Sequence, residues 1–570
     1  MSAVAAAPPA TAQSDRRLPP WWPLAALILL SAVLRLVTLD QQSFWYDEAF
    51  TPVHVLHDGL GATLRAVVHH ENTPPLWYLI AWADVRLFGD GALALRLPSA
   101  LAGVLTVPAV WAIGQQLAGR RVALIAAAIV AVNPLFVWYS QEARAYGLFV
   151  LMSALAMLCF VRALDEPTPR RMAAFALAGA LALLTHYFAV FLLIGMVPWL
   201  LRDRARRRAA LAPTAALAVV GLALLPLISA QGGHGTQWIG RWALSSRLQA
   251  IPQYFLTGYS GGPLGHGVEL LIALPILAGV ALGTWRLIAP PARPEAAAAQ
   301  SSTPGARPVP AAQSFTVGVH PAPASPDRLR RGALIALSVA ACGVLLPIAL
   351  AVFGADYLAP RNLVGAMIPL SVLIAVLLAA ADIDPAAPHG LPTSTGLSAL
   401  LRPGVALAAT IVVAFAVMSV DVDLSPRLQR GNWREVARAL RAPLGPSAIT
   451  TVELGAAPLE YYMDPLRNLP RRASVRVSEI DETGYAPLRH GAGRPPAPGF
   501  RLLARKNLDG LIVYRFVSSV PRLVSEAELR RHVITLAHPE VLVPAGDRTL
   551  TTTTITGSLR SQMSSSDENI

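Results

Sequence analysis

The sequence is poor in charge, in cysteine and in lysine. Of its 570 residues only 14% are charged, whereas 54% are hydrophobic and the mean hydropathy is +0.49. That balance excludes a soluble globular protein of this length. The two cysteines, Cys159 and Cys342, each lie inside an apolar run, so neither a disulfide framework nor a thiolate metal site is expected. Lys506 is the one lysine, a bias typical of a GC-rich bacterial genome.

Apolar runs fill most of the chain, and many approach or exceed the roughly 17 residues needed to cross a bilayer. We therefore predict a polytopic α-helical membrane protein with about eleven transmembrane helices. The first run is one of many and is not read as a cleaved signal peptide. The predicted spans are residues 22–39, 97–117, 122–139, 145–164, 172–185, 187–201, 211–228, 268–288, 333–353, 363–381 and 405–420.

The net charge of +13 comes from arginine clusters in short loops between these runs. The positive-inside rule explains such clusters better than a nucleic-acid partner does. Residues 75–88 carry Asp84 and Arg86, and we interpret them as an interfacial helix, because a span there would put the later arginine clusters outside. The resulting topology places five polar residues at the outer face: Asp47, Glu48, Glu142, His186 and Arg361.

The composition also divides the chain into regions. Polar, low-complexity ends predict disorder, and the mixed composition after residue 420 predicts a small α/β domain outside the membrane. In that domain we expect helices at 433–440 and 458–462 and strands at 447–454 and 510–516. The predicted regions are a cytoplasmic N-terminus (1–20), a membrane domain (21–420) with an outer loop (40–96) and a cytoplasmic linker (290–331), the outer domain (421–550) and a tail (551–570).

Asp47 and Glu48 follow the first apolar run, where a membrane helix meets water. Taken alone, the pair fits a helix cap and a first-turn acid, although a carboxylate at this position can also act as a base. The later segment with His70, Glu71 and Asn72 fits an interfacial turn, because two prolines follow it. A His-His-Glu metal site is disfavoured there, since adjacent side chains point apart.

Two arginines, Arg96 and Arg361, fall on the outer side, which should lack them. Each could extend to lipid headgroups, or the two could clamp a phosphate, for which the planar guanidinium is suited. Glu142 and Arg144 add a carboxylate and a positively charged guanidinium at another outer helix end. Those two could simply pair with each other, which would stabilise little at a wet surface.

Five segments together resemble the GT-C glycosyltransferases, membrane enzymes that use lipid-phosphate sugars, and in particular their protein O-mannosyltransferase and aminoarabinose-transferase branch (glycosyltransferase family 39-like). Each segment alone is weak evidence, but the five occur in order at matching topological positions from about residue 22 to 420. The sequence departs from the family at Asn362, where a tyrosine is common. The segments are WYDEA (45–49), ENTPPL (71–76), RLPSA (96–100), YSQEARAY (139–146) and YLAPRNL (357–363).

The resemblance implies an inverting transfer of a sugar, mannose first, from a polyprenyl monophosphate to an acceptor hydroxyl outside the plasma membrane. Asp47 matches the catalytic base and Glu48 an orienting acid, while Arg96 and Arg361 would bind the donor phosphate. The resemblance assigns no certain cofactor and no metal ligand, and it allows a divalent cation. The supporting residues implied are His70, Glu71, Asn72, Glu142, Arg144, Tyr146, His186 and Tyr357.

Several points stay open at this level. Arabinose, glucose and galactose follow mannose as the sugar, and the acceptor could be a glycan, a lipid or a protein. The other protein class considered is a transporter or lipid flippase. Transporters usually carry ionisable groups near the midplane, broken helices and repeats, whereas the notable charges here lie at outer helix ends.

Overall fold

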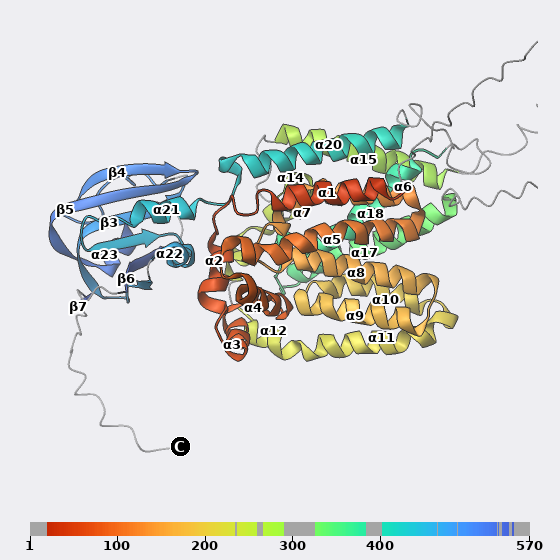
Figure 1. Cartoon of the computed structure of the whole chain (residues 1–570), viewed down its shortest axis with the longest axis horizontal. Helices are drawn as coiled ribbons and strands as arrows, with labels where there is room; N and C mark the ends of the chain where they lie inside the picture. The colour runs from red at the N-terminus through yellow and green to blue at the C-terminus, as the bar shows by residue number, and fades with distance from the viewer. Residues whose placement is uncertain are drawn as a thin grey trace, which may run out of the picture.

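The protein is an elongated helical bundle with a β-sheet domain at one end (Figure 1). The computed structural model describes residues 20–233, 236–258, 266–289, 325–383 and 402–551, with gaps at 464, 487, 533, 535–538 and 546–549. The two predicted tails lie outside the described residues, apart from residues 20 and 551. The predicted mostly helical membrane fold with a C-terminal sheet domain is confirmed.

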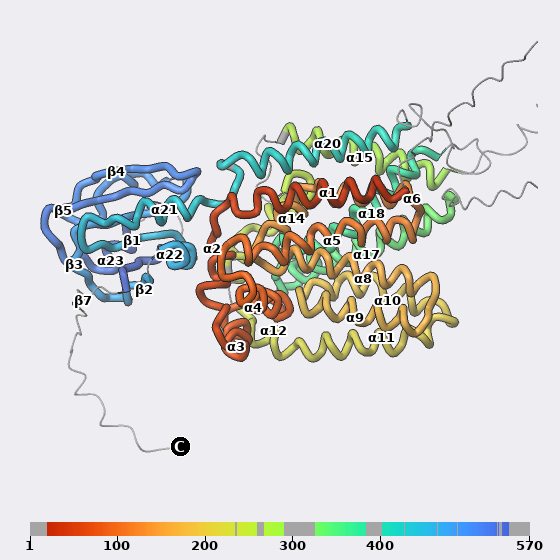
Figure 2. The backbone as a smooth tube through the Cα atoms, in the orientation of Figure 1, coloured from red at the N-terminus to blue at the C-terminus, as the bar shows by residue number. Residues whose placement is uncertain are grey.

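Apolar helices run side by side along the length of the bundle (Figure 2). Each predicted span coincides with a helix or with two consecutive helices. The helices are α1 (Trp22–Leu36), α5 (Ala92–Ala118), α6 (Arg120–Val132), α7 (Pro134–Ser140), α8 (Tyr146–Asp165), α9 (Pro169–Thr185), α10 (Ala189–Leu201), α11 (Arg204–Ala223), α12 (Leu225–Gln231), α15 (His266–Ile288), α17 (Pro326–Val352), α18 (Met367–Ala380) and α20 (Pro403–Leu424).

Helix length and composition give fewer transmembrane spans than the about eleven that the sequence predicts. Within the described residues, seven helices are long and apolar enough to cross a membrane, or eight if the bent pair α6 and α7 forms one span. The helices α1 and α10 are apolar but shorter. The chain is therefore a multi-pass membrane protein, while the figure of about eleven spans stays a prediction.

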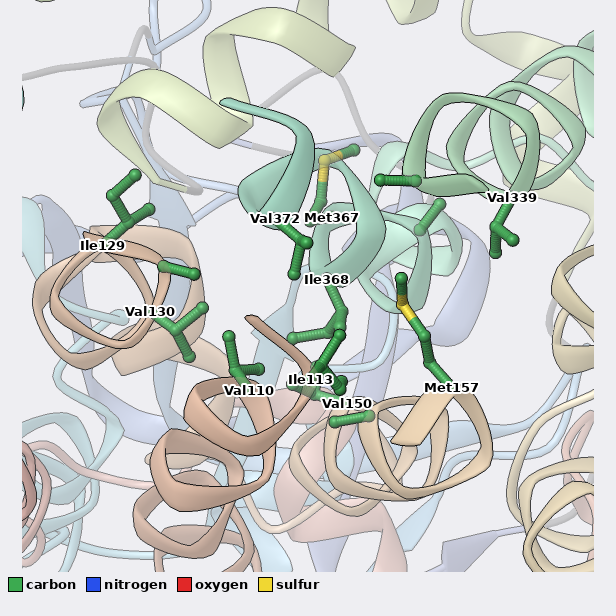
Figure 3. Close-up of a cluster of buried hydrophobic side chains, with 14 of the residues drawn as sticks. Val110, Ile113, Ile129, Val130, Val150, Met157, Val339, Met367, Ile368 and Val372 are labelled. Carbon is green, nitrogen blue, oxygen red and sulfur yellow. The ribbon is translucent and has the colours of Figure 1, made fainter. Parts of the chain in front are cut away.

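Figure 3 shows a cluster of buried apolar side chains inside the bundle. Val110 and Ile113 come from α5, and they face Ile368 and Val372 of α18 and Val150 of α8. In the apolar segment that contains α18 (Pro360–Ala380), 89% of the membrane-crossing residues are buried inside the protein. In the segment formed by α11 and α12 (Arg204–Gln231) only 11% are buried. The helix α18 thus forms the core, and α11 lies at the lipid-facing periphery.

Proline and capping residues set two helix boundaries that the apolar pattern alone does not show. Asn133 accepts a hydrogen bond from the Leu135 amide, and Pro134 occupies the first turn of α7, so α6 and α7 meet at an angle of 56°. Ser325 caps α17 in the same way. The predicted linker 290–331 was therefore too long, since the chain is already helical from Pro326; residues 290–324 lie outside the described part.

Short helices cover the end of the bundle that faces the sheet, and the connection from α10 to α11 lies at the other end (Figure 1). The segment predicted to be an interfacial helix is helical, as α4 (Leu76–Phe88). The others are α2 (Tyr46–Phe50), which continues as the π-helix η1 (Thr51–Val55), and α3 (Leu60–His70), α13 (Gln237–Arg241), α14 (Leu244–Thr257) and the 3₁₀ helix η2 (Pro360–Ala366).

The C-terminal domain is a seven-stranded sheet with three helices. The strand order is β2-β6-β1-β3-β5-β4, with β7 also paired to β3, and among the described strands only β1 and β3 pair in parallel. The elements are the 3₁₀ turn η3 (Pro426–Leu428), α21 (Trp433–Leu440), β1 (Ser447–Thr451), α22 (Ala456–Tyr462), β2 (Leu466–Asn468), β3 (Ser474–Tyr485), β4 (Arg501–Leu508), β5 (Leu511–Ser525), α23 (Glu526–Arg531), β6 (Glu540–Pro544) and β7 (Leu550–Thr551).

Candidate active site at the sheet-facing end of the bundle

The acidic pair Asp47–Glu48 lies in the first turn of α2, after Trp45 in an extended conformation. The amides of Glu48 and Ala49 both donate to the Trp45 carbonyl, which starts the helix. Because successive residues of a helix are about 100° apart around its axis, the two carboxylates point in different directions. Each one meets a different arginine.

Glu48 pairs with Arg96 of α5 in a closed, dry contact. The Arg96 Nε and Nη2 atoms lie 2.7 Å from Oε1 and Oε2 of Glu48, and the two side chains are only 1% and 0% exposed. Burial alone would raise the pKa of Glu48, but Arg96 and Arg430, with the Ala143 amide, outweigh it and hold that pKa below its usual value. The charged form of Glu48 is therefore favoured, and it holds Arg96 in place.

Arg96 donates all of its N–H groups to the protein. Besides Glu48, it donates from Nη1 to the carbonyl oxygens of Leu39 (2.9 Å) and Gln42 (2.8 Å), and from Nη2 to that of Ser43 (3.1 Å). A guanidinium has five N–H donors, so none remains for another acceptor. This geometry speaks against the predicted contact of Arg96 with the donor phosphate; Arg96 instead fixes the loop that enters α2.

Asp47 pairs with Arg361 in a more open setting. The Arg361 Nη1 atom lies 2.6 Å from Asp47 Oδ2, and both side chains are 18% exposed. The guanidinium also faces the rings of Trp238 and Tyr146, at 4.9 and 5.9 Å. Within the described part of the chain, Arg361 makes no other hydrogen bond, so most of its N–H groups remain free for a ligand.

The loop that presents Arg361 is held from below by α14. Arg247 donates to both carboxylate oxygens of Asp356, at 2.6 and 2.7 Å, and to the Leu358 carbonyl at 2.9 Å. The side-chain Nδ2 of Asn362 donates to the Tyr357 carbonyl at 3.0 Å, which closes the turn before η2. The side chain of Tyr357 is 47% exposed, so in this structure the residue contributes chiefly through its backbone.

Arg144 pairs with Glu71 and not with Glu142. Its Nη1 and Nη2 atoms lie 2.8 and 2.9 Å from the Glu71 carboxylate, and Nη1 also lies 3.3 Å from Thr51 Oγ1 at the start of η1. The pairing of Glu142 with Arg144 considered from the sequence is therefore wrong, because the turn at 141–145 directs the two side chains apart. The neighbouring residues differ, since Asn72 is half-buried and His70 is exposed.

Glu142 is buried without a hydrogen bond. Its side chain is 0% exposed, and neither carboxylate oxygen has a hydrogen-bond partner in the described structure. Its nearest cation is Arg430, whose Nη2 atom lies 3.5 Å from Oε2. Burial raises the pKa of Glu142 to about 7, and the nearby charges of Glu48 and Asp47 act in the same direction.

His186 and Tyr146 form an aromatic side of the site. The His186 ring stacks on Phe149 with centroids 4.6 Å apart, and its Nδ1 atom accepts the Phe188 amide at 3.2 Å. Burial, aided by the charges of Arg361 and Arg144, lowers the pKa of His186 to about 3, so the imidazole is neutral at physiological pH. The ring of Tyr146 lies 5.9 Å from that of His186.

The structure thus brings Asp47, Glu48, Glu142, Arg96 and Arg361 to one end of the bundle and leaves His70 and the Tyr357 side chain at the surface. The sequence analysis missed Arg430, which lies beyond the last span in a stretch assigned to the outer domain. It also missed Arg247 and Trp238, because no local pattern marks them. Asp356, one residue before a quoted motif, could have been noticed. No cluster of three or more His, Cys, Asp or Glu that could hold a metal occurs in the described ranges.

The C-terminal domain contacts the loop that leads into α2. Ser43 Oγ donates to the Gly431 carbonyl at 2.8 Å and accepts the Trp433 amide at 3.0 Å. The Phe44 amide donates to the hydroxyl of Tyr462 at 2.7 Å. Trp45 packs in one apolar cluster with Trp433 and other residues of that domain. The site is therefore built from both parts of the chain.

Comparison with known proteins supports the resemblance seen in the sequence. Residues 72–230 match a family model described as dolichyl-phosphate-mannose-protein mannosyltransferase. The matched region includes Arg96, Glu142, Arg144 and His186, whereas Asp47 and Arg361 lie outside it. No curated protein sequence matches the chain significantly.

Similar solved structures are membrane glycosyltransferases. The chain is 14% identical to ArnT from Cupriavidus metallidurans bound to undecaprenyl phosphate, covering 87% of this chain and 98% of that one, with a TM-score of 0.46. The chain is 16% identical to the arabinofuranosyltransferase AftD from Mycobacteria, and the match covers 93% of this chain and 42% of that one with a TM-score of 0.47. It is 21% identical to the Pmt1-Pmt2 protein O-mannosyltransferase complex of S. cerevisiae bound to the sugar donor. That match covers 39% of this chain and 35% of that one, with a TM-score of 0.29.

Proposed function

We propose that the chain is a glycosyltransferase of the GT-C superfamily and that it transfers a sugar from a polyprenyl monophosphate to an acceptor hydroxyl on the outer face of the plasma membrane. Mannose is the proposed sugar, because the matched family model describes mannosyltransferases. The acceptor is a glycan, lipid or protein that presents a free hydroxyl. Membrane lipids surround the bundle, and the donor reaches the site from them through its polyprenyl chain.

The observation that carries this proposal is the half-open pair of Asp47 and Arg361. Arg361 has one hydrogen bond to the protein and keeps further N–H groups free, and it can form charge-assisted bonds with a phosphate. A donor phosphate would compete with Asp47 for Arg361. Asp47 would then be released as a carboxylate beside the reacting sugar, within reach of an acceptor hydroxyl.

The reaction follows from that exchange. The acceptor oxygen attacks the anomeric carbon while its proton passes to Asp47, and the bond from that carbon to the phosphate oxygen breaks with its electron pair kept by the phosphate. A phosphate needs no general acid to leave, so one base suffices. Arg361 stabilises the charge that grows on the departing polyprenyl phosphate. A single displacement inverts the configuration, so a β-linked donor gives an α-linked product.

The remaining residues support this chemistry from a distance. Glu48 and Arg96 hold α2, and the pair of Glu71 and Arg144 braces η1 through Thr51. Neutral His186 and Tyr146 form an apolar wall that strengthens the electrostatic contacts of the site. His70, Asn72 and Tyr357 lie toward the surface, where they could contact the donor or the acceptor. The proposal routes no step through a divalent cation.

Glu142 is the competing base. A pKa of about 7 would suit a general base near neutral pH. Its carboxylate is 0% exposed, however, whereas that of Asp47 is 18% exposed. An acceptor hydroxyl must come within hydrogen-bonding distance of the base, so access favours Asp47.

The test is a transfer assay with purified protein and a radiolabelled mannosyl polyprenyl phosphate. We expect release of polyprenyl phosphate with transfer of the label to an envelope acceptor fraction. Activity with an arabinosyl donor alone would revise the sugar, whereas movement of intact donor across proteoliposomes without its consumption would support a flippase and overturn the proposal.

A second arm tests the side of the membrane in a background with Cys159 and Cys342 replaced by serine. An impermeant thiol reagent should label Asp58→Cys, which is exposed near α2, in intact spheroplasts. It should label Arg208→Cys, in the basic loop region, only after lysis. The reverse pattern would place the site in the cytoplasm.

A further inference from the structure

We infer that Arg430 is a positioning residue that holds Glu48 and Glu142 in place for the transfer reaction and makes the site depend on the docked C-terminal domain. This inference rests on the proposed function. Arg430 lies between η3 and α21, in the segment that joins the last membrane helix to the sheet.

The side chain of Arg430 is 1% exposed and enters the bundle between two carboxylates. Its Nε atom lies 3.7 Å from Glu48 Oε2, and its Nη2 atom lies 3.5 Å from Glu142 Oε2. The guanidinium also lies 4.2 Å from the ring centre of Trp138 and donates to the Trp138 carbonyl at 3.1 Å. Its backbone amide and Nη1 both donate to Gln42 Oε1, at 3.2 and 3.3 Å.

The charges of this buried group balance only with Arg430 present. Glu48 is already neutralised by Arg96, whereas Glu142 has no hydrogen-bond partner in the described residues and depends on Arg430 for a nearby positive charge. A buried carboxylate without a counter-charge is costly and takes up a proton instead. The titratable and charged groups that face Glu142 are Asp47, Glu48, Tyr139, Tyr146, Arg361 and Arg430.

An ionised Glu142 matters because it lies close enough to Asp47 to influence it. The Asp47 charge is one of the causes that raise the pKa of Glu142, so the two side chains belong to one electrostatic group. Arg430 acts in the opposite direction on Glu142: its positive charge lowers the pKa that burial raises to about 7 and so favours the ionised form. Arg430 therefore supports the base without touching the substrate.

The same segment holds the entrance to α2. Gly431, next to Arg430, accepts the Ser43 hydroxyl, and Trp433 donates its amide to that hydroxyl. Gln42, which binds Arg430, precedes Ser43. Displacing the C-terminal domain would thus withdraw Arg430 from the glutamates and loosen the loop that carries Asp47.

The test compares Arg430→Gln and Arg430→Lys with the control Arg434→Gln. Arg434 belongs to the same junction, but its side chain is 30% exposed and it binds Asp40 at 3.3 Å. Transfer is measured from pH 5.5 to 9, and folding is followed by size-exclusion chromatography. In Arg430→Gln the pKa of Glu142 should rise, so the loss of transfer should be largest near pH 7 and should shrink as the pH increases.

Arg430→Lys should retain most of the wild-type profile, and Arg434→Gln should match the wild type. An equal loss at every pH, or an unchanged profile in Arg430→Gln, would overturn the inference. If Arg430→Gln does not fold, Gln42→Ala, which removes the acceptor holding Arg430, should shift the profile in the same direction. Absence of transfer by the wild type would instead refute the proposed function.

Discussion

Asp47 and Glu48 are neighbours in the sequence, yet their surroundings differ in nearly every physical respect. Glu48 is 0% exposed and bound by both sides of the Arg96 fork, whereas Asp47 is 18% exposed and has a single contact with Arg361. All five N–H groups of Arg96 already donate to protein acceptors, whereas Arg361 still has N–H groups that can bind a ligand. The closed pair suits a structural role, and the open pair suits chemistry, because only the open pair can exchange partners.

The strongest test of this difference is Asp47→Asn. Asparagine keeps the size and helix-capping ability of aspartate but cannot take the acceptor proton. Transfer should fall by about 10²- to 10⁴-fold, the usual contribution of a general base, while folding and donor binding persist. Turnover with the labelled donor and donor binding by equilibrium dialysis measure the two effects.

The matched control is Asp58→Asn, an exposed acid in the same outer loop, which should transfer at the wild-type rate. Near wild-type activity in Asp47→Asn, together with complete loss in Glu142→Gln, would identify Glu142 as the catalytic base. The Asp47–Arg361 pair would then have no catalytic role that distinguishes it from the Glu48–Arg96 pair.

Glu48→Gln should act on stability before it acts on chemistry. Removing one partner of a buried ion pair typically costs about 3–5 kcal/mol, since the other charge is left uncompensated. Arg96 would lose its carboxylate partner, and Arg430 would keep Glu142 alone. A reduced thermal midpoint in detergent is the expected result. Glu435→Gln is the control, because Glu435 is 41% exposed in its pair with Arg438 and should contribute little. A Glu48→Gln protein as stable as the wild type would show that the closed pair is dispensable.

Arg361→Ala should weaken donor binding with little effect on folding. Losing a charge-assisted contact costs on the order of 1.5–3 kcal/mol, or roughly 10- to 150-fold at 1.4 kcal/mol per decade. Arg361→Lys should restore part of the affinity, since lysine offers a point charge in place of a planar fork. Donor dissociation constants measured by titration give the ratio. In contrast, Arg96→Ala should lower stability; a selective loss of donor affinity there would restore the phosphate role predicted for it.

The sequence predicted the membrane fold and most of the polar residues that gather at one end of the bundle. Apolar runs and arginine clusters report a lipid environment directly, and the helices at 433–440 and near 458–462 were found from their periodicity. Five strands of the sheet were missed, as their alternation is irregular. The partners of Arg96 and Arg144 could not be foreseen, because they depend on packing between α2, α5 and the turn at 141–145.

The same limit applies to Arg430, which lies 388 residues from its partner Gln42. That separation has a consequence for biogenesis. A ribosome adds about 5–20 residues per second, so roughly 20–80 s pass between synthesis of the loop entering α2 and synthesis of the arginine that completes it. Glu48 can find Arg96 early, but Glu142 waits for Arg430. Until the last membrane helix is inserted and the sheet begins to dock, the growing chain carries its base without the group that positions it. If Arg430 has the proposed role, the growing chain would be inactive until Arg430 reaches the loop that enters α2.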